Sequence, residues 1–197
     1  MKPVLFIDFD GTLCHDRFWR SLPQEDFAKV QELLFKDDTT LLEEWMLGKR
    51  TAEEVNRFLA EQMGMPYEKL WELFVRDAET MRVPQGALAQ IAALRDRYTI
   101  VLITVNMDSF DRFTVPALEL DAYFDSISNS YHEGLFKNDS GGEVFRKYLE
   151  MYQAPVEHSF LIDDSTAACA TFTALGGTAY QVTPEKGVTH HLAQISG

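Results

Sequence analysis

The sequence predicts an α/β protein: a Rossmann-like parallel sheet with helices on both faces, plus a small all-helical cap inserted after the first strand. Two observations lead to this fold class. Short, continuous apolar runs alternate with segments of helical periodicity, which is the pattern of a parallel sheet buried on both faces. A long segment between the first two runs shows helical periodicity alone. We therefore expect residues 1–14 and 84–197 to form the α/β core and residues 15–83 to form the cap.

The first strand is expected at residues 4–7, where four apolar residues follow one another without alternation. Asp8 and Asp10 come directly after it, and Gly11 lets the backbone turn sharply. Residues two apart on a strand point the same way, so the two carboxylates repel each other and a cation relieves the repulsion. A single Asp in such a place more often begins a turn, but the complete stretch favours a site.

Residues 25–81 show helical periodicity only. Thr51 and Glu54 have the spacing of a capping box. Gly64 stands where a helix should end, and Pro66 suits the start of the next helix. Met and aromatic residues at helical spacing indicate a small core within the cap, not a cofactor site.

Strand and helix alternate again after the cap, which implies a parallel sheet. We expect a helix at 88–94, a strand at 100–103, a helix at 108–120 limited or kinked by Pro116, a weak strand at 123–128, a helix that follows a capping box at 140–143, a strand at 160–162, a helix at 167–175, a strand at 180–182 and a helix at 190–195.

Three of the apolar strands end in polar residues. These are Asp8 and Asp10, then Thr104, then Asp163 and Asp164. Parallel strands place their carboxyl ends at one edge of a sheet, so these residues should meet in one crevice. Carboxylates suit Mg²⁺, which often joins one or two of them to a substrate phosphate, and a carboxylate can attack phosphorus to form an aspartyl-phosphate.

A hydroxyl and a lysine complete this set. Thr104 can donate a hydrogen bond to a phosphoryl oxygen, and Lys137 can supply positive charge to the same group. Taken alone, Lys137 is best explained as an exposed surface lysine. Its position between Thr104 and Asp163 in the chain favours a place in the site.

The order of these residues resembles the four motifs of the haloacid dehalogenase (HAD) superfamily. Motif I is similar to Asp8-Phe9-Asp10-Gly11-Thr12, motif II to the strand that ends at Thr104, motif III to Lys137, and motif IV to Asp163-Asp164-Ser165. The helical insertion resembles the C1 cap class. Residues 48–54 and the paired Asp163-Asp164 are most similar to the small-molecule phosphatase branch that includes the amino-terminal domains of soluble epoxide hydrolases.

The resemblance implies a role for each residue. Asp8 is the nucleophile and a magnesium ligand, and Asp10 is the general acid and later the base, with its carbonyl on the metal. Asp164 is implied as a direct metal ligand, with Asp163 direct or through water. The candidates for binding the substrate are Gly11, Thr104, Val105, Asn106 and Lys137, and Arg17 is added to them as a cation near the site. The superfamily's dehalogenases lack an acid at the position of Asp10, which argues against dehalogenation.

Three positions depart from the superfamily pattern. Thr104 is followed directly by Val105 and then Asn106, whereas in the superfamily the residue directly after the hydroxyl residue is more often Asn or Gly. Lys137 is followed by Asn138, where Pro is commoner. Ala168 stands where Asp or Asn often braces the motif IV loop. The first two leave the chemistry intact, and the third concerns loop geometry and metal affinity.

Composition limits the partners. The formal net charge of −13 argues against a nucleic-acid-binding face, and no apolar run approaches the ~20 residues of a membrane span. Cys14 and Cys169 are too few for a disulfide framework, so we expect free thiols and a cytoplasmic protein. The sequence does not determine the oligomeric state.

We therefore expect a magnesium-dependent phosphatase that hydrolyses a small phosphomonoester through an aspartyl-phosphate. The alternatives are a phosphomutase of the same superfamily and a catalytically idle binding or regulatory protein. Substrate identity should depend on residues of the cap that face the crevice, for which His15, Arg17, Trp19 and Arg20 are candidates.

Overall fold

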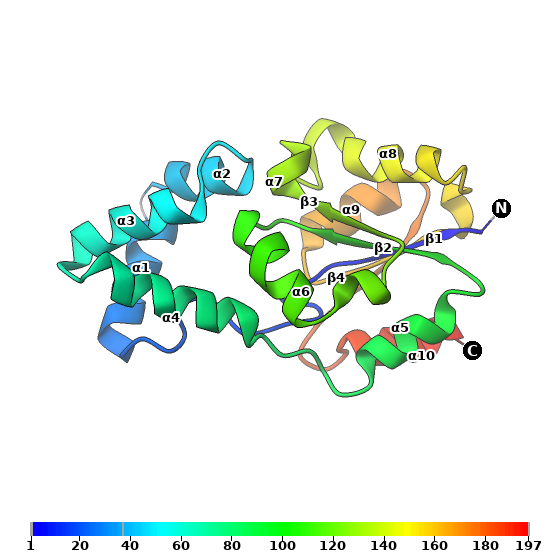
Figure 1. Cartoon of the computed structure of the whole chain (residues 1–197). Coiled ribbons are helices and arrows are strands. Elements are labelled where there is room, and N and C mark those ends of the chain that lie inside the picture. Colours follow the sequence, from blue (N-terminus) through cyan, green and yellow to red (C-terminus); the bar gives the residue numbers. More distant parts are fainter. Residues whose placement is uncertain (1, 37, 197) are drawn as a thin grey trace.

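A five-stranded parallel sheet forms the centre of the computed structural model, which describes residues 2–36 and 38–196 (Figure 1). The α/β class is confirmed. The sheet has the order β3-β2-β1-β4-β5, and its strands are β1 Val4–Ile7, β2 Thr99–Thr104, β3 Ser126–Asn129, β4 Phe160–Asp163 and β5 Thr178–Gln181. The predicted domain ranges include residues 1, 37 and 197, which lie outside the described residues.

The first strand is buried on both faces because helices cover both sides of the sheet. Leu5 and Ile7 belong to the apolar cluster beneath α5 (Ala87–Leu94) and α10 (Val188–Ser196). Val4 and Phe6 belong to the opposite cluster, under α8 (Glu143–Met151) and α9 (Thr166–Ala174). Figure 1 shows these two helix pairs on opposite sides of the strands. A strand in this setting needs apolar residues at every position, as the sequence provides.

Four helices lie beyond the carboxyl ends of the strands, grouped on the left in Figure 1. They are α1 Gln24–Phe35, α2 Thr40–Met46, α3 Ala52–Met63 and α4 Tyr67–Glu79. The capping box of Thr51 and Glu54 is confirmed at the start of α3, and Gly64 ends this helix in the left-handed conformation. Trp19, Trp45 and Phe74 pack together between the helices. They belong to the same continuous apolar cluster as Leu5 and Ile7, so the helices share a core with the sheet.

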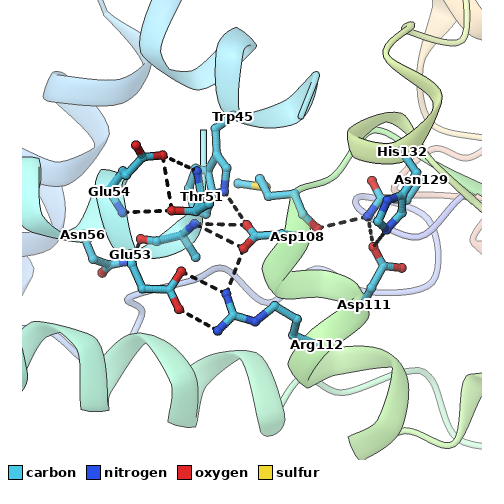
Figure 2. A network of polar contacts seen from close by, with 12 residues as sticks. Trp45, Thr51, Glu53, Glu54, Asn56, Asp108, Asp111, Arg112, Asn129 and His132 are labelled. Carbon is cyan, nitrogen blue, oxygen red and sulfur yellow. Dashed lines mark hydrogen bonds and ion pairs between the residues drawn. The ribbon is translucent and has the colours of Figure 1, made fainter. Parts of the chain in front are cut away.

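Asp108, just beyond β2, fastens the helical segment to the sheet (Figure 2). Its carboxylate accepts hydrogen bonds from the Trp45 indole nitrogen at 2.7 Å and from the Ala52 backbone N–H at 3.1 Å. It also pairs with Arg112 at 2.9 Å, and Arg112 in turn reaches Glu53 of α3 at 2.6 Å. The first turn of α3 is thus held by a buried carboxylate from the core.

Two predicted elements are wrong in part. The predicted helix at 108–120 is helical without interruption from 108 to 117, but its middle part is the π-helix η1 (Phe110–Thr114), followed by α6 (Val115–Ala117) and then, after a break, by the 3₁₀ turn η2 (Leu120–Ala122). The predicted capping box at 140–143 does not form, because Ser140 has φ 48° and α8 begins at Glu143, with Gly142 (φ 85°) as an N-cap residue that has no side chain to cap the helix.

The predicted strand at 123–128 lies at 126–129, and the one at 180–182 lies at 178–181. The remaining short elements are α7 Ser130–Glu133, η3 Asp139–Gly141 and η4 Val156–His158.

Two predictions from composition can be compared with the structure. Cys14 and Cys169 are both buried free thiols, as expected. Within residues 2–36 and 38–196, no helix combines the length and the apolar character that a membrane crossing needs. The cytoplasmic location remains a prediction.

Candidate active site

A pocket of about 230 Å³ opens at the carboxyl edge of the sheet, where β1, β2 and β4 end. Its lining residues are Asp8, Asp10, Val105, Lys137, Asn138, Asp163, Asp164, Ser165 and Ala168. The chain turns from one side of β1 to the other at this point in the strand order, and such a switch point is where open α/β sheets bind ligands. The fold therefore brings six of the predicted site residues into one pocket.

Lys137 lies at the centre of the buried charges. Its ammonium is 2.6 Å from Asp8 Oδ1 and 2.6 Å from Asp163 Oδ2. All three side chains are at least nine-tenths buried. Lys137 is therefore buried beside these carboxylates and is not an exposed surface lysine, the alternative that its position in the chain disfavoured. Burial raises the pKa of Asp8. The positive charge of Lys137 lowers it by less, and repulsion from Asp163 raises it further. The single positive charge of Lys137 thus does not balance the two negative charges of Asp8 and Asp163.

Three carboxylates have the arrangement of a cation site. Asp8, Asp163 and Asp164 each offer an oxygen, and these oxygens lie within 4.8 Å of one another. Burial and the Asp163 charge also raise the pKa of Asp164. Hard cations such as Mg²⁺ prefer oxygen ligands of this kind. The donor set therefore fits Mg²⁺.

Asp10 faces the same pocket from the turn after β1. Its Oδ2 accepts a hydrogen bond from Asn106 Nδ2 at 2.6 Å, which orients the carboxyl group. Burial raises the pKa of Asp10 to about 6, while Arg17 and Lys137 lower it. Asp10 therefore holds a proton more readily than an ordinary carboxyl group does.

The loop after β2 is tied to the helical segment. The backbone N–H of Asn106 donates to Ser130 Oγ at 3.1 Å, and Ser130 Oγ lies 2.8 Å from the carbonyl of Met46. Thr104 is buried, with its hydroxyl 3.5 Å from Asn106 Nδ2. Val105 lies at the pocket wall between these two residues. The predicted phosphate-binding loop thus has a fixed backbone.

The loop that carries Asp163 and Asp164 is held without a polar side chain at position 168. The Asp164 N–H donates to Thr12 Oγ1 at 3.0 Å, and the Ser165 N–H donates to Asp163 Oδ1 at 2.8 Å. Gln181 of β5 donates to the Asp164 carbonyl at 3.1 Å. Ala168 is itself buried in the apolar layer of α9. Thr12 and Gln181 therefore supply the bracing that the residue at 168 does not.

Gly11 is required by the close approach of two loops. Its φ is +82°, a region that side chains disfavour. A Cβ built on this residue would overlap the Asp164 carboxylate. Any larger residue would push the motif I turn away from the motif IV loop.

The four candidates for substrate recognition have different surroundings. His15 and Arg17 line a second pocket that adjoins the first at Asp164. Trp19 is buried and donates to Asn56 Oδ1 at 3.0 Å. Arg20 donates to the Asp77 carbonyl at 2.6 Å. Trp19 and Arg20 therefore have structural contacts, and only His15 and Arg17 face a pocket.

Sequence reasoning missed several residues that position the site. Thr12 stands inside the motif I stretch, so its hydroxyl was a visible signal. Ser130, Gln181 and Asp108 carried none, because each acts through a partner distant in the sequence: Asn106, Asp164 and Trp45, respectively.

No protein-family model matches the chain, and no curated protein sequence matches it. Solved structures do match its fold. A HAD family enzyme from Bacteroides thetaiotaomicron, in complex with magnesium and inorganic phosphate, is 20% identical, with a TM-score of 0.76 over 97% of this chain and 99% of that one. A predicted HAD-like family hydrolase from Porphyromonas gingivalis is 19% identical, with a TM-score of 0.76 over 100% and 98%.

A 2-haloacid dehalogenase from Pseudomonas syringae is 16% identical, with a TM-score of 0.69 over 100% of this chain and 97% of that one. Structures of proteins named as phosphate-complexed enzyme, hydrolase and dehalogenase thus share one architecture. At these identities the likeness establishes that the chain shares its fold with these structures, and the activity must be argued from its own site.

Proposed function

We propose that the protein is a magnesium-dependent phosphatase that hydrolyses a small phosphomonoester through an aspartyl-phosphate at Asp8. The observation that carries the proposal is the group formed by Asp8, Asp163, Asp164 and Lys137, with Asp10 in the same pocket. This group offers a nucleophile, ligands for a cation, a fixed positive charge and a separate acid. The magnesium and inorganic phosphate bound to the Bacteroides enzyme of the same fold support it.

The site residues divide the first half of the reaction among themselves. Asp8 attacks phosphorus in line with the leaving alcohol, and Asp10 gives that alcohol its proton. Lys137, Thr104 and the Val105 N–H bind the phosphoryl oxygens. Asp8, Asp163, Asp164 and the Asp10 carbonyl would hold Mg²⁺, which when bound would supply positive charge to neutralise those oxygens.

In the second half of the reaction Asp10 acts as a general base instead of a general acid. Having lost its proton to the leaving group, Asp10 accepts one from water, and that water attacks the aspartyl-phosphate. The hydrogen bond from Asn106 to Asp10 holds the carboxyl group in place for both steps. Inorganic phosphate leaves and Asp8 is restored.

Asp10 distinguishes this reaction from that of the dehalogenase neighbour. A halide leaves without a proton, whereas an alcohol leaves with one, so an acid beside the nucleophile is useful only to a phosphatase or a phosphomutase. A phosphomutase would return the phosphate to a sugar hydroxyl in a site closed to water. An idle binding protein would keep the pocket and turn nothing over.

The proposal is tested by phosphate release from a panel of phosphomonoesters, with Mg²⁺ and with a chelator. The Asp8→Asn variant keeps the size of the side chain and removes the nucleophile. We expect release that requires Mg²⁺ and is lost in the variant. Release that persists in Asp8→Asn contradicts the proposed nucleophile, isomerised product without free phosphate indicates the mutase, and neither product indicates the idle protein.

A further inference from the structure

A second pocket, of about 500 Å³, adjoins the candidate catalytic pocket. Its lining includes Gly11, His15, Arg17, Asp164, Thr183 and Gly187. Asp164 lines both pockets, so they meet at the proposed cation site. The second pocket is large enough for the alcohol part of a small phosphomonoester.

Arg17 lies on the side of the site where the alcohol would leave. Arg17 lines the second pocket together with Gly11, the residue that directly follows Asp10, and with Asp164, which lines both pockets. Asp10 is the proposed donor of a proton to the leaving oxygen, so the group attached to that oxygen extends toward Arg17.

The Arg17 guanidinium is available to a ligand. Its hydrogen bond within residues 2–36 and 38–196 runs from Nη1 to the backbone carbonyl of Asp16 at 3.2 Å, and no carboxylate of these residues forms an ion pair with it. Arg82 and Arg112, by contrast, are paired with carboxylates at 2.9 Å and 2.6 Å. A guanidinium has five N–H donors in a planar fork that suits a carboxylate or a phosphate.

The backbone on both sides of Arg17 is anchored. Asp16 accepts bonds from the Arg82 backbone N–H at 3.1 Å and from its guanidinium at 3.0 Å and 2.9 Å. Arg20 donates to the carbonyls of Asp77 and Thr80 at 2.6 Å and 2.8 Å. Arg17 is therefore presented from a fixed backbone, which lowers the entropy that a ligand must overcome.

The net charge of the whole protein makes the position of Arg17 in the second pocket informative about the charge of the ligand. With a formal net charge of −13, the protein repels anions in general. A neutral leaving group would need no cation in the second pocket. Arg17, which lines this pocket together with His15, suits a leaving group that is itself anionic.

We propose that the pocket at Arg17 and His15 binds the alcohol part of the substrate and that this part carries an anionic substituent. The substrate class is then a phosphorylated hydroxy acid or a small bisphosphate. This inference rests on the proposed phosphatase activity and adds to it the chemical class of the leaving group. Arg17 binds the substituent, and His15 adds a second polar contact.

The test compares substrates that differ only in that substituent. Glycerol 2-phosphate is matched with 2-phosphoglycerate, and ethyl phosphate with phosphoglycolate; ethylene glycol bisphosphate separates a second phosphate from a carboxylate. The value measured is the ratio of kcat/KM for the anionic member to that for its neutral partner. It is measured in the wild type, in Arg17→Gln and Arg17→Lys, and in Arg57→Gln, an exposed arginine on α3 whose guanidinium packs over Tyr67.

We expect the wild-type ratio to favour the anionic members by about 10- to 100-fold, the range for a charge-assisted hydrogen-bonded pair. The ratio should fall toward one in Arg17→Gln, fall less in Arg17→Lys and stay unchanged in Arg57→Gln. Equal release from both members in the wild type would overturn the inference and leave the phosphatase standing. A preference that survives in Arg17→Gln would also overturn it, and no release from any member would overturn both.

Discussion

Removal of the Asp108 carboxylate should destabilise the protein strongly, because it anchors the helical segment from inside the structure. The Trp45 side chain and Ala52 are fully buried, and Asp108 itself is 7% exposed. In Asp108→Ala the Trp45 indole N–H and the Ala52 N–H, both buried, lose their acceptor. Each buried donor left without a partner costs about 1–3 kcal/mol.

The two donors together give an expected loss of about 2–6 kcal/mol in the free energy of unfolding. The Arg112 ion pair adds at most about 1 kcal/mol, because Arg112 is 41% exposed and such pairs contribute little. Asp108→Asn should cost less, about 1–2 kcal/mol, since its carbonyl oxygen can still accept from Trp45 and Ala52.

Urea unfolding followed by circular dichroism measures these values. Glu53→Gln is the control, because it breaks the more exposed contact of the same Arg112 and should cost about 1 kcal/mol or less. Trp45→Phe combined with Asp108→Ala gives the energy of the indole contact by a double-mutant cycle. A loss below about 1 kcal/mol in Asp108→Ala would refute the reasoning, because such a value is typical of a surface residue.

Three other perturbations give separate predictions. Lys137→Met leaves Asp8 and Asp163 buried without their counter-charge, so the metal-free protein should lose about 3–5 kcal/mol of stability; Mg²⁺ should restore part of it, and a melting temperature that Mg²⁺ does not raise would contradict this. Thr12→Val removes the acceptor of the Asp164 N–H, so calorimetric titration should show Mg²⁺ binding weakened about tenfold; unchanged binding would exclude Thr12 as a brace. Burial lowers the pKa of His191, so this histidine favours the folded state fully above its unfolded pKa of about 6.5 and progressively less as the pH falls below that value. The stability of the wild type relative to His191→Gln should therefore decrease from pH 7 to pH 5, and a constant difference would contradict the shift.

The parts of the fold that were predicted correctly depend on local sequence. The runs at 4–7 and 160–162 contain apolar residues only, without the alternation of apolar and polar residues that a half-exposed strand shows. They therefore fit a strand covered on both faces. The capping box at Thr51 forms because both of its partners lie within one turn. The convergence of Asp8, Asp163 and Asp164 followed from the direction of parallel strands, without knowledge of side-chain contacts.

The errors come from backbone conformations that tertiary contacts select. Ser140 and Glu143 have the spacing of a capping box, yet Gly141 and Gly142 both take positive φ and start the helix two residues later. Beyond β2, Asp108 is directed toward Trp45, 63 residues away in the sequence. The segment after it winds as a π-helix instead of a regular α-helix. Periodicity carries no information about partners so distant.

The substrate side of the site was only partly predictable for the same reason. Four residues after motif I were equal candidates in the sequence. Trp19 and Arg20 are occupied by contacts with Asn56, Asp77 and Thr80, which leaves His15 and Arg17 facing a pocket. Which of the four residues face a pocket therefore depends on how residues 15–20 pack against α3 and α4.

The central claim, that Asp8 carries the phosphoryl group, is tested most directly by trapping the intermediate. Asp10→Asn should accumulate it from p-nitrophenyl phosphate, because this leaving group needs no acid while hydrolysis still needs the base. Acid quenching followed by borohydride reduction should convert Asp8 to homoserine, detectable by mass spectrometry of the peptide. Homoserine at position 8 that requires both Mg²⁺ and substrate is the predicted result. Turnover of the same substrate by the wild type with no modification of Asp8 in the variant would contradict the account.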